Sequence, residues 1–340
     1  MTTDDTPPLR WLNAADVEAA MPPLDERLRL AERTMVALVA DAELPPKIGV
    51  HPRPEGSFAH AMPAHLRGRP CAGGGPESTR DLLGIKWIAG FPANRGLGLP
   101  AIHGLVLLTD SATGVPLAIL DAGPVTAQRT AAISGVAIAR FARPLGRPAR
   151  VALLGAGVQA RSHLPVLGAV LPAATITVFD RHADRAEAVA SQARTTEGIA
   201  AGRVARTARE ATADADVVVT VASFAPAAER QVLTPDWLTP EALVVAVDYA
   251  TYVSASVARE AALFAVDERA QFLANRDSGS FEGYPDPMTT IGEAIVARAE
   301  PPIGGRVLVT HLGVGLADLV FGEAIVRRAT ELGLGTVLPR

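Results

Sequence analysis

The second half of the chain alternates between short apolar runs and longer amphipathic runs. The apolar runs are rich in Val, Ile, Leu and Ala, and alanine-rich segments stand between them. Strands that alternate with helices in this way predict a parallel sheet. The expected strands are 151–157, 175–180, 204–208, 217–223, 243–248, 262–267 and 306–313, and the clearest helices are 158–171 and 183–195.

The first half of the chain has a different pattern. Residues 14–41 predict a helix that is interrupted at Pro22-Pro23, and residues 46–120 form short β-rich runs broken by Gly, Pro and Asn. The stretch "TDSATGVPLAIL" predicts a hairpin with its turn at 110–114. The remaining expected elements are strands at 47–51, 85–90 and 104–109, a helix at 127–142 and a last helix from about 315 to about 332.

Composition favours a packed protein of about two domains, or one domain with a large insertion. The chain has 340 residues, of which 49% are hydrophobic and 20% charged, and its formal net charge is −4. No run of Lys and Arg forms a basic stripe, so we do not expect nucleic-acid binding. The N-terminus has no secretory signal, and no apolar run reaches about 18 residues, so we expect no membrane span and a cytoplasmic protein.

The single cysteine limits the chemistry. Cys71 excludes an internal disulfide and a zinc site built from several cysteines, and we expect no metal. It lies in the Gly/Pro-rich stretch "GRPCAGGGPES", which predicts a flexible loop. We interpret Cys71 as incidental.

The stretch "VALLGAGVQA" contains a GxGxxA fingerprint in the context that its function requires. It follows an apolar strand and opens a helix. Gly155 permits the tight turn, Gly157 lets the backbone approach a pyrophosphate, and Ala160 lets helix and strand pack closely. The alternative is an ordinary tight turn. The candidate cofactor-binding residues here are Gly155, Ala156, Gly157, Val158, Gln159 and Ala160.

The second strand of this region ends in Asp180, 25 residues after Gly155. A carboxylate there accepts hydrogen bonds from a ribose diol and repels a 2′-phosphate, which favours NAD. Arg181 follows directly, and arginine suits NADP, so NADP remains the alternative. Asp180 could also cap the helix that begins near residue 183.

Two cations stand in apolar surroundings. Lys86 lies inside the apolar run "GIKWIAGF", and Arg129 lies on an alanine-rich helix. A buried ammonium is costly unless a negative group meets it, so one interpretation is that the Lys86 stem lies on apolar surface while its head reaches water. Arg129 could similarly be a surface residue. The alternative for both is a carboxylate partner.

Seven motifs, in order and spacing, resemble the ornithine cyclodeaminase/μ-crystallin family over residues 44 to 330. They are "LPPK", "AMPA", "GIKWIAGFPANRGLGLP", "GLVLLTDSATGVPLAILDA", "VTAQRTAAISGVAIARF", "VALLGAGVQARS" and "GVGLADL". The resemblance implies an α/β fold in which a Rossmann NAD(P)-binding domain, 131–313, is inserted in a discontinuous α+β substrate-binding and dimerisation domain, 1–130 and 314–340. It also implies a homodimer.

The resemblance also implies residue roles. Lys86 matches the family's active-site lysine, Arg129 its carboxylate-binding arginine and Asp248 its catalytic aspartate. Asp248 could instead cap a helix at 253–261. Asp318 matches the family pattern and is expected to act behind the substrate-contacting groups or as a cap. Lys47, His60 and Met62 are further candidate substrate-binding residues, and Thr130 and Arg181 complete the cofactor set.

Three positions depart from the family pattern. Many members have arginine where this chain has Lys47, which loses the bidentate grip on a carboxylate. Arg53 is nearby and could compensate, or it could equally be a loop charge. Cyclodeaminase members tend to have glutamate where this chain has His60. The "YATYVSA" that follows Asp248 differs from the usual "PGKxEL" continuation. The change at His60 makes ornithine specificity doubtful.

These residues favour an NAD(P)-dependent oxidoreductase for a small α-amino or α-imino acid, such as an amino-acid dehydrogenase or a ketimine reductase. A cyclodeaminase-type ammonia-lyase that uses bound NAD is the alternative. A nucleotide-binding protein without activity is the third reading, and charges gathered at one apolar site argue against it.

Overall fold

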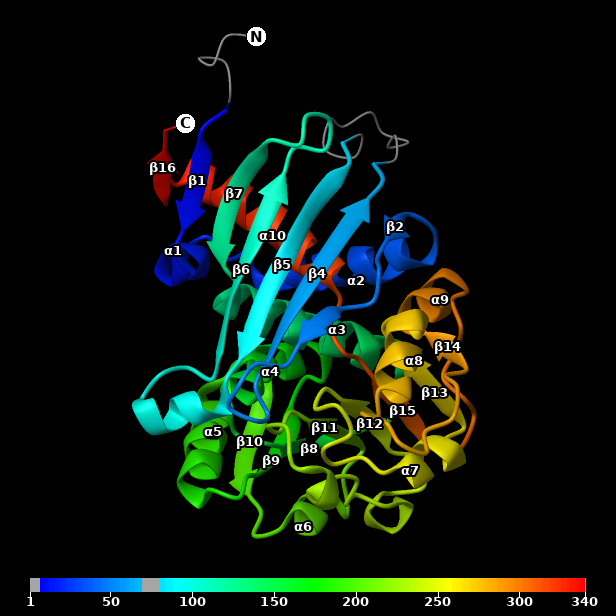
Figure 1. The fold of residues 1–340 in the computed structure, drawn as a ribbon. Helices are drawn as coiled ribbons and strands as arrows, with labels where there is room; N and C mark the ends of the chain where they lie inside the picture. Colours follow the sequence, from blue (N-terminus) through cyan, green and yellow to red (C-terminus); the bar gives the residue numbers. More distant parts are fainter. Residues whose placement is uncertain (1–6, 69–79, 340) are drawn as a thin grey trace. The chain divides into compact units, whose positions relative to one another are not determined.

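The computed structural model describes residues 7–68 and 80–339, and Cys71 therefore lies outside the described residues. The chain divides into two compact units. Unit 1 comprises Met1–Arg129 with Val314–Arg340, and unit 2 comprises Thr130–Gly313. The boundaries expected from the sequence lie within one residue of these divisions. Figure 1 shows the elements of both units.

Unit 1 is built on a mixed sheet with the strand order β16-β1-β7-β6-β5-β4-β2, and β3 pairs with β4. β1 pairs parallel with β7, whereas the strands from β4 to β7 form antiparallel neighbours. The strands are β1 (Leu9–Leu12), β2 (Ala42–Glu43), β3 (Ile48–Val50), β4 (Phe58–Leu66), β5 (Leu82–Gly90), β6 (Ile102–Thr109), β7 (Pro116–Asp121) and β16 (Thr336–Leu338). Its helices are α1 (Ala14–Ala19), α2 (Leu24–Ala40) and α10 (Gly315–Glu331), and α3 (Ala122–Phe141) leads into unit 2.

One face of this sheet carries the core of unit 1. Met62, Lys86 and Val106 lie opposite one another on β4, β5 and β6, and all three are buried. Side chains on a strand alternate between faces, so every second residue of these strands points to the same side. The apolar helix α10 packs against β4, β5 and β6 (Figure 1). Lys86 is therefore placed in the layer between sheet and helix.

Unit 2 contains a fully parallel sheet with the strand order β10-β9-β8-β11-β12-β15-β13-β14. The order reverses between β8 and β11, which is the doubly wound arrangement of dinucleotide-binding folds. The strands are β8 (Arg150–Leu154), β9 (Ala174–Phe179), β10 (Ile199–Val204), β11 (Val217–Thr220), β12 (Leu243–Ala246), β13 (Leu263–Val266), β14 (Thr289–Thr290) and β15 (Val307–Thr310). The helices are α4 (Val158–Val170), α5 (Ala183–Thr195), α6 (Ala208–Thr212), α7 (Ala255–Glu260), α8 (Arg269–Asp277) and α9 (Ile291–Val296).

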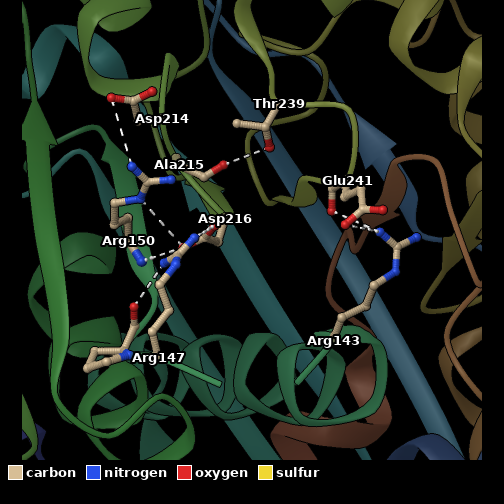
Figure 2. Close-up of polar contacts among 9 residues, drawn as sticks. Arg143, Arg147, Arg150, Asp214, Ala215, Asp216, Thr239 and Glu241 are labelled. Atoms are coloured by element: carbon tan, nitrogen blue, oxygen red, sulfur yellow. Dashed lines mark hydrogen bonds and ion pairs between the residues drawn. The ribbon is translucent and has the colours of Figure 1, made fainter. Parts of the chain in front are cut away.

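Arginines fasten the segment between α3 and β8 to the amino ends of these strands (Figure 2). The Arg147 guanidinium donates two hydrogen bonds to the Asp216 carboxylate, at 2.7 and 2.8 Å, and the Arg150 backbone N–H donates a third at 2.8 Å. Arg143 forms an ion pair with Glu241 at 3.6 Å. These contacts hold the amino edge of the sheet, opposite the edge that carries the dinucleotide turn.

The α/β fold with a Rossmann-type domain is confirmed, and individual elements need correction. The expected strand at 204–208 is wrong, because β10 ends at Val204 and α6 begins at Ala208. The expected helix at 127–142 begins earlier, at Ala122, and the sequence did not single out β1, β4 or β16. The interruption at Pro22-Pro23 separates α1 from α2 as expected. Within the described ranges, no helix combines the length and the apolar character needed to cross a membrane.

Candidate active site

Lys86 lies in a buried ion-pair cluster of unit 1. Its side chain is only 1% exposed, and Nζ donates to Asp318 Oδ1 at 2.9 Å. The interpretation in which the ammonium reaches water is therefore wrong. β5 places Lys86 on the covered face of the sheet, and α10 presents Asp318 from its first turn. A residue of the last helix thus supplies the negative partner.

Arg129 belongs to the same cluster. Its Nε donates to the same Asp318 oxygen at 3.2 Å, and its side chain is 6% exposed, so the surface interpretation is wrong as well. Asp318 Oδ2 is buried and has no hydrogen-bond partner. Because Nε is used for Asp318, the two Nη groups form the edge of the guanidinium that suits an incoming carboxylate. Thr130, the next residue of α3, is buried.

The cluster lowers the pKa of Lys86 to about 7. Desolvation by burial is the largest cause, and the positive charges of Arg129 and Lys47 act in the same direction, while Asp318 opposes them. Two cations share one carboxylate, so charging the lysine is less favourable than in water. An amine with this pKa exists in both protonation states near neutral pH.

The other substrate candidates lie on β4 or close to it. Met62 is buried directly opposite Lys86 in the strand ladder. His60 lies two residues away on the same face, with its ring stacked on Phe58 at a centroid distance of 4.7 Å. Burial, followed by the charges of Lys47 and His51, lowers the pKa of His60 to about 4. His60 is therefore neutral at neutral pH.

Lys47 and Arg53 differ in their relation to the cluster. Lys47 is half-buried before β3 and lies close enough to lower the pKa of both Lys86 and His60. Arg53 is exposed in the turn between β3 and β4. Of these two cations, Lys47 is the one whose charge acts on Lys86, in addition to that of Arg129.

The dinucleotide-binding turn of unit 2 has the backbone that its sequence predicts. Gly155 has φ +110°, and an added Cβ would lie 2.8 Å from the Val221 carbonyl oxygen, so only glycine fits. Gly157 is the N-cap of α4, and an added Cβ there would meet nothing within 4 Å. The space before Gly157 and the start of a 13-residue helix fit a phosphate group.

The remaining fingerprint residues surround this turn. Ala156 and Ala160 are buried, Val158 is exposed and Gln159 is half-buried. Asp180 accepts the backbone N–H of Ala156 at 2.8 Å and that of His182 at 2.9 Å, so its carboxylate is oriented by the turn. His182 is the N-cap of α5, so the cap role considered for Asp180 is wrong. Arg181 is exposed beside it.

Asp248 is buried after β12, at the carboxyl edge of the parallel sheet. The Thr220 hydroxyl and the N–H groups of Ala222, Thr251 and Tyr252 face it, but none reaches hydrogen-bonding geometry. Burial raises the pKa of Asp248 to about 6. The N-cap of α7 is Ser254, so Asp248 does not cap that helix.

Sequence reasoning underestimated Asp318 and did not select Tyr252. Burial, together with the charges of Asp248 and Asp180, raises the pKa of Tyr252 to about 12, which places Tyr252 near both carboxylates. The signal for Asp318 was a single acid in the apolar first half of the last helix, "GLADLVFG". Among the residues that the structure describes, no group of three or more His, Cys, Asp or Glu could hold a metal ion.

Comparisons with known proteins agree with this arrangement. Residues 13–296 match the model of the ornithine cyclodeaminase/mu-crystallin family. The nodulation efficiency protein NfeD of Rhizobium meliloti is 33% identical over 97% of this chain and 98% of its own length. The ketimine reductase mu-crystallin of Mus musculus is 28% identical over 73% of this chain and 77% of its length.

A solved structure of an archaeal alanine dehydrogenase dimer with bound NAD has the same fold. Its TM-score is 0.79 at 23% identity, and the match covers 96% of this chain and 98% of that chain. The family model spans most of this chain, and NfeD matches this chain almost from end to end. This chain therefore belongs to the ornithine cyclodeaminase/mu-crystallin family.

Proposed function

We propose that the protein is an NAD(H)-dependent oxidoreductase that interconverts a small α-amino acid and the corresponding imino or keto acid. The observation that carries this proposal is the buried cluster in which Lys86 and Arg129 share one oxygen of Asp318. A protein that only binds nucleotides has no use for two desolvated cations there, because burying them costs free energy.

The cations of unit 1 would bind the substrate carboxylate. Arg129 offers its Nη edge, which matches a carboxylate in a bidentate way. Lys47 adds positive charge near Lys86, as its effect on the Lys86 pKa indicates. A bound carboxylate would favour the charged form of Lys86, so substrate binding raises its pKa and prepares it as a proton donor. His60 and Met62 would then contact the rest of a small substrate.

Asp248 would hold the proton of the substrate nitrogen. Its pKa of about 6 means that it is mostly ionised at neutral pH but close enough to accept and return a proton. NAD(H), when bound, supplies the hydride chemistry. Gly155, Gly157 and the start of α4 would hold the pyrophosphate, and Ala160 would allow helix and strand to pack closely. Thr130, which is buried in α3, is a further candidate cofactor-binding residue.

We propose NAD rather than NADP as the preferred cofactor. The two hydrogen bonds from backbone N–H groups orient the Asp180 carboxylate at the end of β9, where a dinucleotide ribose is recognised. Arg181 is exposed and could meet a 2′-phosphate only beside this negative charge. Relatives that bind NAD, such as the archaeal alanine dehydrogenase, support the same choice.

The cyclodeaminase alternative requires a group that receives the distal amine of ornithine or lysine. The position that carries an acid in such members holds His60 here, and burial keeps that imidazole neutral. A neutral ring offers no charge to a distal ammonium group. The structure therefore favours the oxidoreductase, and ammonia release from ornithine measures the alternative directly.

We also propose a homodimer formed through the open face of the unit 1 sheet. Ile48, Trp87 and Leu105 lie in one row across β3, β5 and β6, on the side opposite Lys86, and are 65%, 46% and 41% exposed. Such an apolar row is typical of an interface. Light scattering should give a dimer, and Trp87→Glu should give a folded monomer. A wild-type monomer at micromolar concentration would disprove the dimer.

The decisive assay follows the reduced cofactor by absorbance. The wild-type protein is given α-keto acids with ammonia or methylamine, and cyclic imines, each with NADH and with NADPH. We expect oxidation of NADH with at least one small imine. The proposal is refuted if the protein turns over none of these substrates and does not bind NADH. Release of ammonia from ornithine or lysine, without net change in the cofactor, would assign the lyase activity instead. The cytoplasmic location remains a prediction from the sequence.

A further inference from the structure

A second buried polar cluster lies in unit 2. Ser134 of α3, His163 of α4 and His311 after β15 are 0%, 0% and 1% exposed. Ser134 Oγ lies 2.8 Å from His163 Nε2 and 2.7 Å from His311 Nε2. His163 Nδ1 lies 2.6 Å from the backbone carbonyl oxygen of Gln159. One hydroxyl therefore joins two buried imidazoles.

The direction of every hydrogen bond in this cluster follows from one acceptor. A carbonyl oxygen can only accept, so His163 Nδ1 carries a proton and donates to Gln159. Burial lowers the pKa of His163 to about 4, so its Nε2 has no proton at neutral pH and must accept from the Ser134 hydroxyl. The Ser134 oxygen then accepts from His311, whose Nε2 must carry a proton.

The two ends of the chain of bonds lie at functionally important places. Gln159 belongs to the first turn of α4, within the GxGxxA fingerprint. His311 directly follows β15, and its backbone N–H donates to Ala246 at the end of β12, the strand that leads to Asp248. In a doubly wound sheet, β8 to β10 form the half that binds the adenosine and β11 onward the half that binds the nicotinamide. The chain of bonds thus runs from the phosphate turn to the nicotinamide half of the sheet.

We propose that Ser134 and His163 fix His311 as the neutral tautomer protonated at Nε2, and that His311 is a positioning residue for the nicotinamide half of the dinucleotide site. Any group that binds His311 through Nδ1 must then donate a hydrogen bond. The same series of hydrogen bonds links His311 to the turn that would hold the phosphates. The inference rests on the proposed dinucleotide binding for its functional part, while the tautomers can be measured without ligand.

The first experiment measures the tautomers in the full-length protein. The protein is labelled with ¹⁵N-histidine, and the signals of His163 and His311 among seven histidines are assigned from His163→Asn and His311→Asn. We expect His163 protonated at Nδ1 and His311 at Nε2, both neutral from pH 6 to 8. A wild-type His311 that is protonated at Nδ1, or charged at pH 7, overturns the proposal without reference to activity.

The second experiment removes the central hydroxyl. Ser134→Ala should leave His163 protonated at Nδ1 but allow His311 to populate both tautomers. It should raise the Kd of NADH about three- to tenfold, the range expected for the loss of one or two buried hydrogen bonds. Ser162→Ala is the matched control. The Ser162 hydroxyl also donates to the Gln159 carbonyl oxygen, at 3.0 Å, but it takes no part in the hydrogen bonds that join His163, Ser134 and His311. The control should change the Kd less than about twofold.

Equal effects of Ser134→Ala and Ser162→Ala on the His311 tautomer and on the NADH Kd would refute the positioning role. If Ser134→Ala does not fold, His163→Gln replaces it, because the glutamine amide can reach the Ser134 hydroxyl but not the Gln159 carbonyl oxygen. In this variant we expect His311 to stay protonated at Nε2. Loss of that tautomer counts against the proposal. A wild-type protein that binds no NADH but shows the expected tautomers would instead refute the proposed function.

Discussion

Replacing Lys86 with methionine separates the cost of burying the ammonium from its use in catalysis. Methionine keeps an unbranched apolar side chain and removes the charge. In the wild type, Nζ makes one hydrogen bond to Asp318, and Arg129 holds the same oxygen. The variant therefore leaves one buried cation paired with one buried anion instead of two cations with one anion.

The expected effect on stability depends on pH. The folded-state pKa of Lys86, about 7, lies below the 10.5 of the unfolded chain. Between these values the unfolded state binds a proton that the folded state lacks, so wild-type stability rises with pH across this window. Below pH 7 the folded protein carries the whole penalty, at most about 5 kcal/mol by the difference in pKa. Lys86→Met removes that penalty.

The lost hydrogen bond acts in the opposite direction. The penalty derived from the pKa already includes the bond of the charged amine, so only the bond of the neutral amine, about 0.5–1.5 kcal/mol, remains to be subtracted. Because about 5 kcal/mol is the upper bound of the penalty, we expect the variant to be about 1–3 kcal/mol more stable than wild type at pH 6. The advantage should shrink as the pH rises and should reverse slightly by pH 10, where wild-type Lys86 is neutral. A change of 1 kcal/mol corresponds to about 2–4 °C in Tm for a unit of this size.

The assay compares thermal unfolding of both proteins from pH 6 to pH 10, without cofactor, and kcat/KM at pH 7.5. We expect kcat/KM to fall about 10²- to 10⁴-fold while the Kd of NADH stays unchanged. A variant that is less stable than wild type at pH 6 and equally stable at pH 10 would refute the burial argument. A folded variant that keeps more than about a tenth of kcat/KM would remove Lys86 from the mechanism.

Three further substitutions test individual carboxylates. Asp180→Ser should weaken NADH binding and reduce the discrimination against NADPH, measured as the ratio of the two Kd values; a wild type that already prefers NADPH would refute the assignment. Asp248→Asn should remove the acidic limb, near pH 6, from the kcat/KM profile of amino-acid oxidation, because that limb reports ionisation of Asp248, and a limb that persists in the variant contradicts its role. Burial alone would raise the pKa of Asp216, but the hydrogen bonds from Arg147 and Arg150 outweigh it and lower the pKa. This carboxylate thus contributes stability that is present above about pH 4 and is lost as the pH falls through its lowered folded-state pKa. Asp216→Asn should therefore lower Tm more at pH 7 than at pH 3, and equal losses at both would show that charge is not involved.

Much of unit 2 could be predicted because its signals are local. The fingerprint at 155–160 follows a buried strand, so spacing and residue type together predict both the fold and the turn. The strand expected at 204–208 failed because two neighbouring segments share a similar composition. Residues 199–204 pair with β9, and Ala208 begins a helix capped by Thr207. Tertiary pairing decided between them, and the pattern does not carry that information.

The cluster around Lys86 was harder to predict, because its partners are far apart in sequence. A lysine in an apolar run is compatible with an exposed ammonium until a buried acid is known to face it. Asp318 is separated from Lys86 by 232 positions, and no local pattern links them. The resemblance to a family indicated the lysine and the arginine, whereas the shared oxygen and the pKa of Lys86 required the packing of α10 on the sheet.

The discontinuity of unit 1 has a consequence for the order in which the protein can fold during translation. Residues up to Arg129 emerge from the ribosome with the apolar face of their sheet uncovered, because α10 and β16 come from the end of the chain. Synthesis of the intervening unit takes about 10–40 s at 5–20 residues per second. Unit 2 is continuous and can fold within that interval, whereas Lys86 waits for Asp318. During this interval, chaperone binding and aggregation of the exposed first segment therefore compete with its folding.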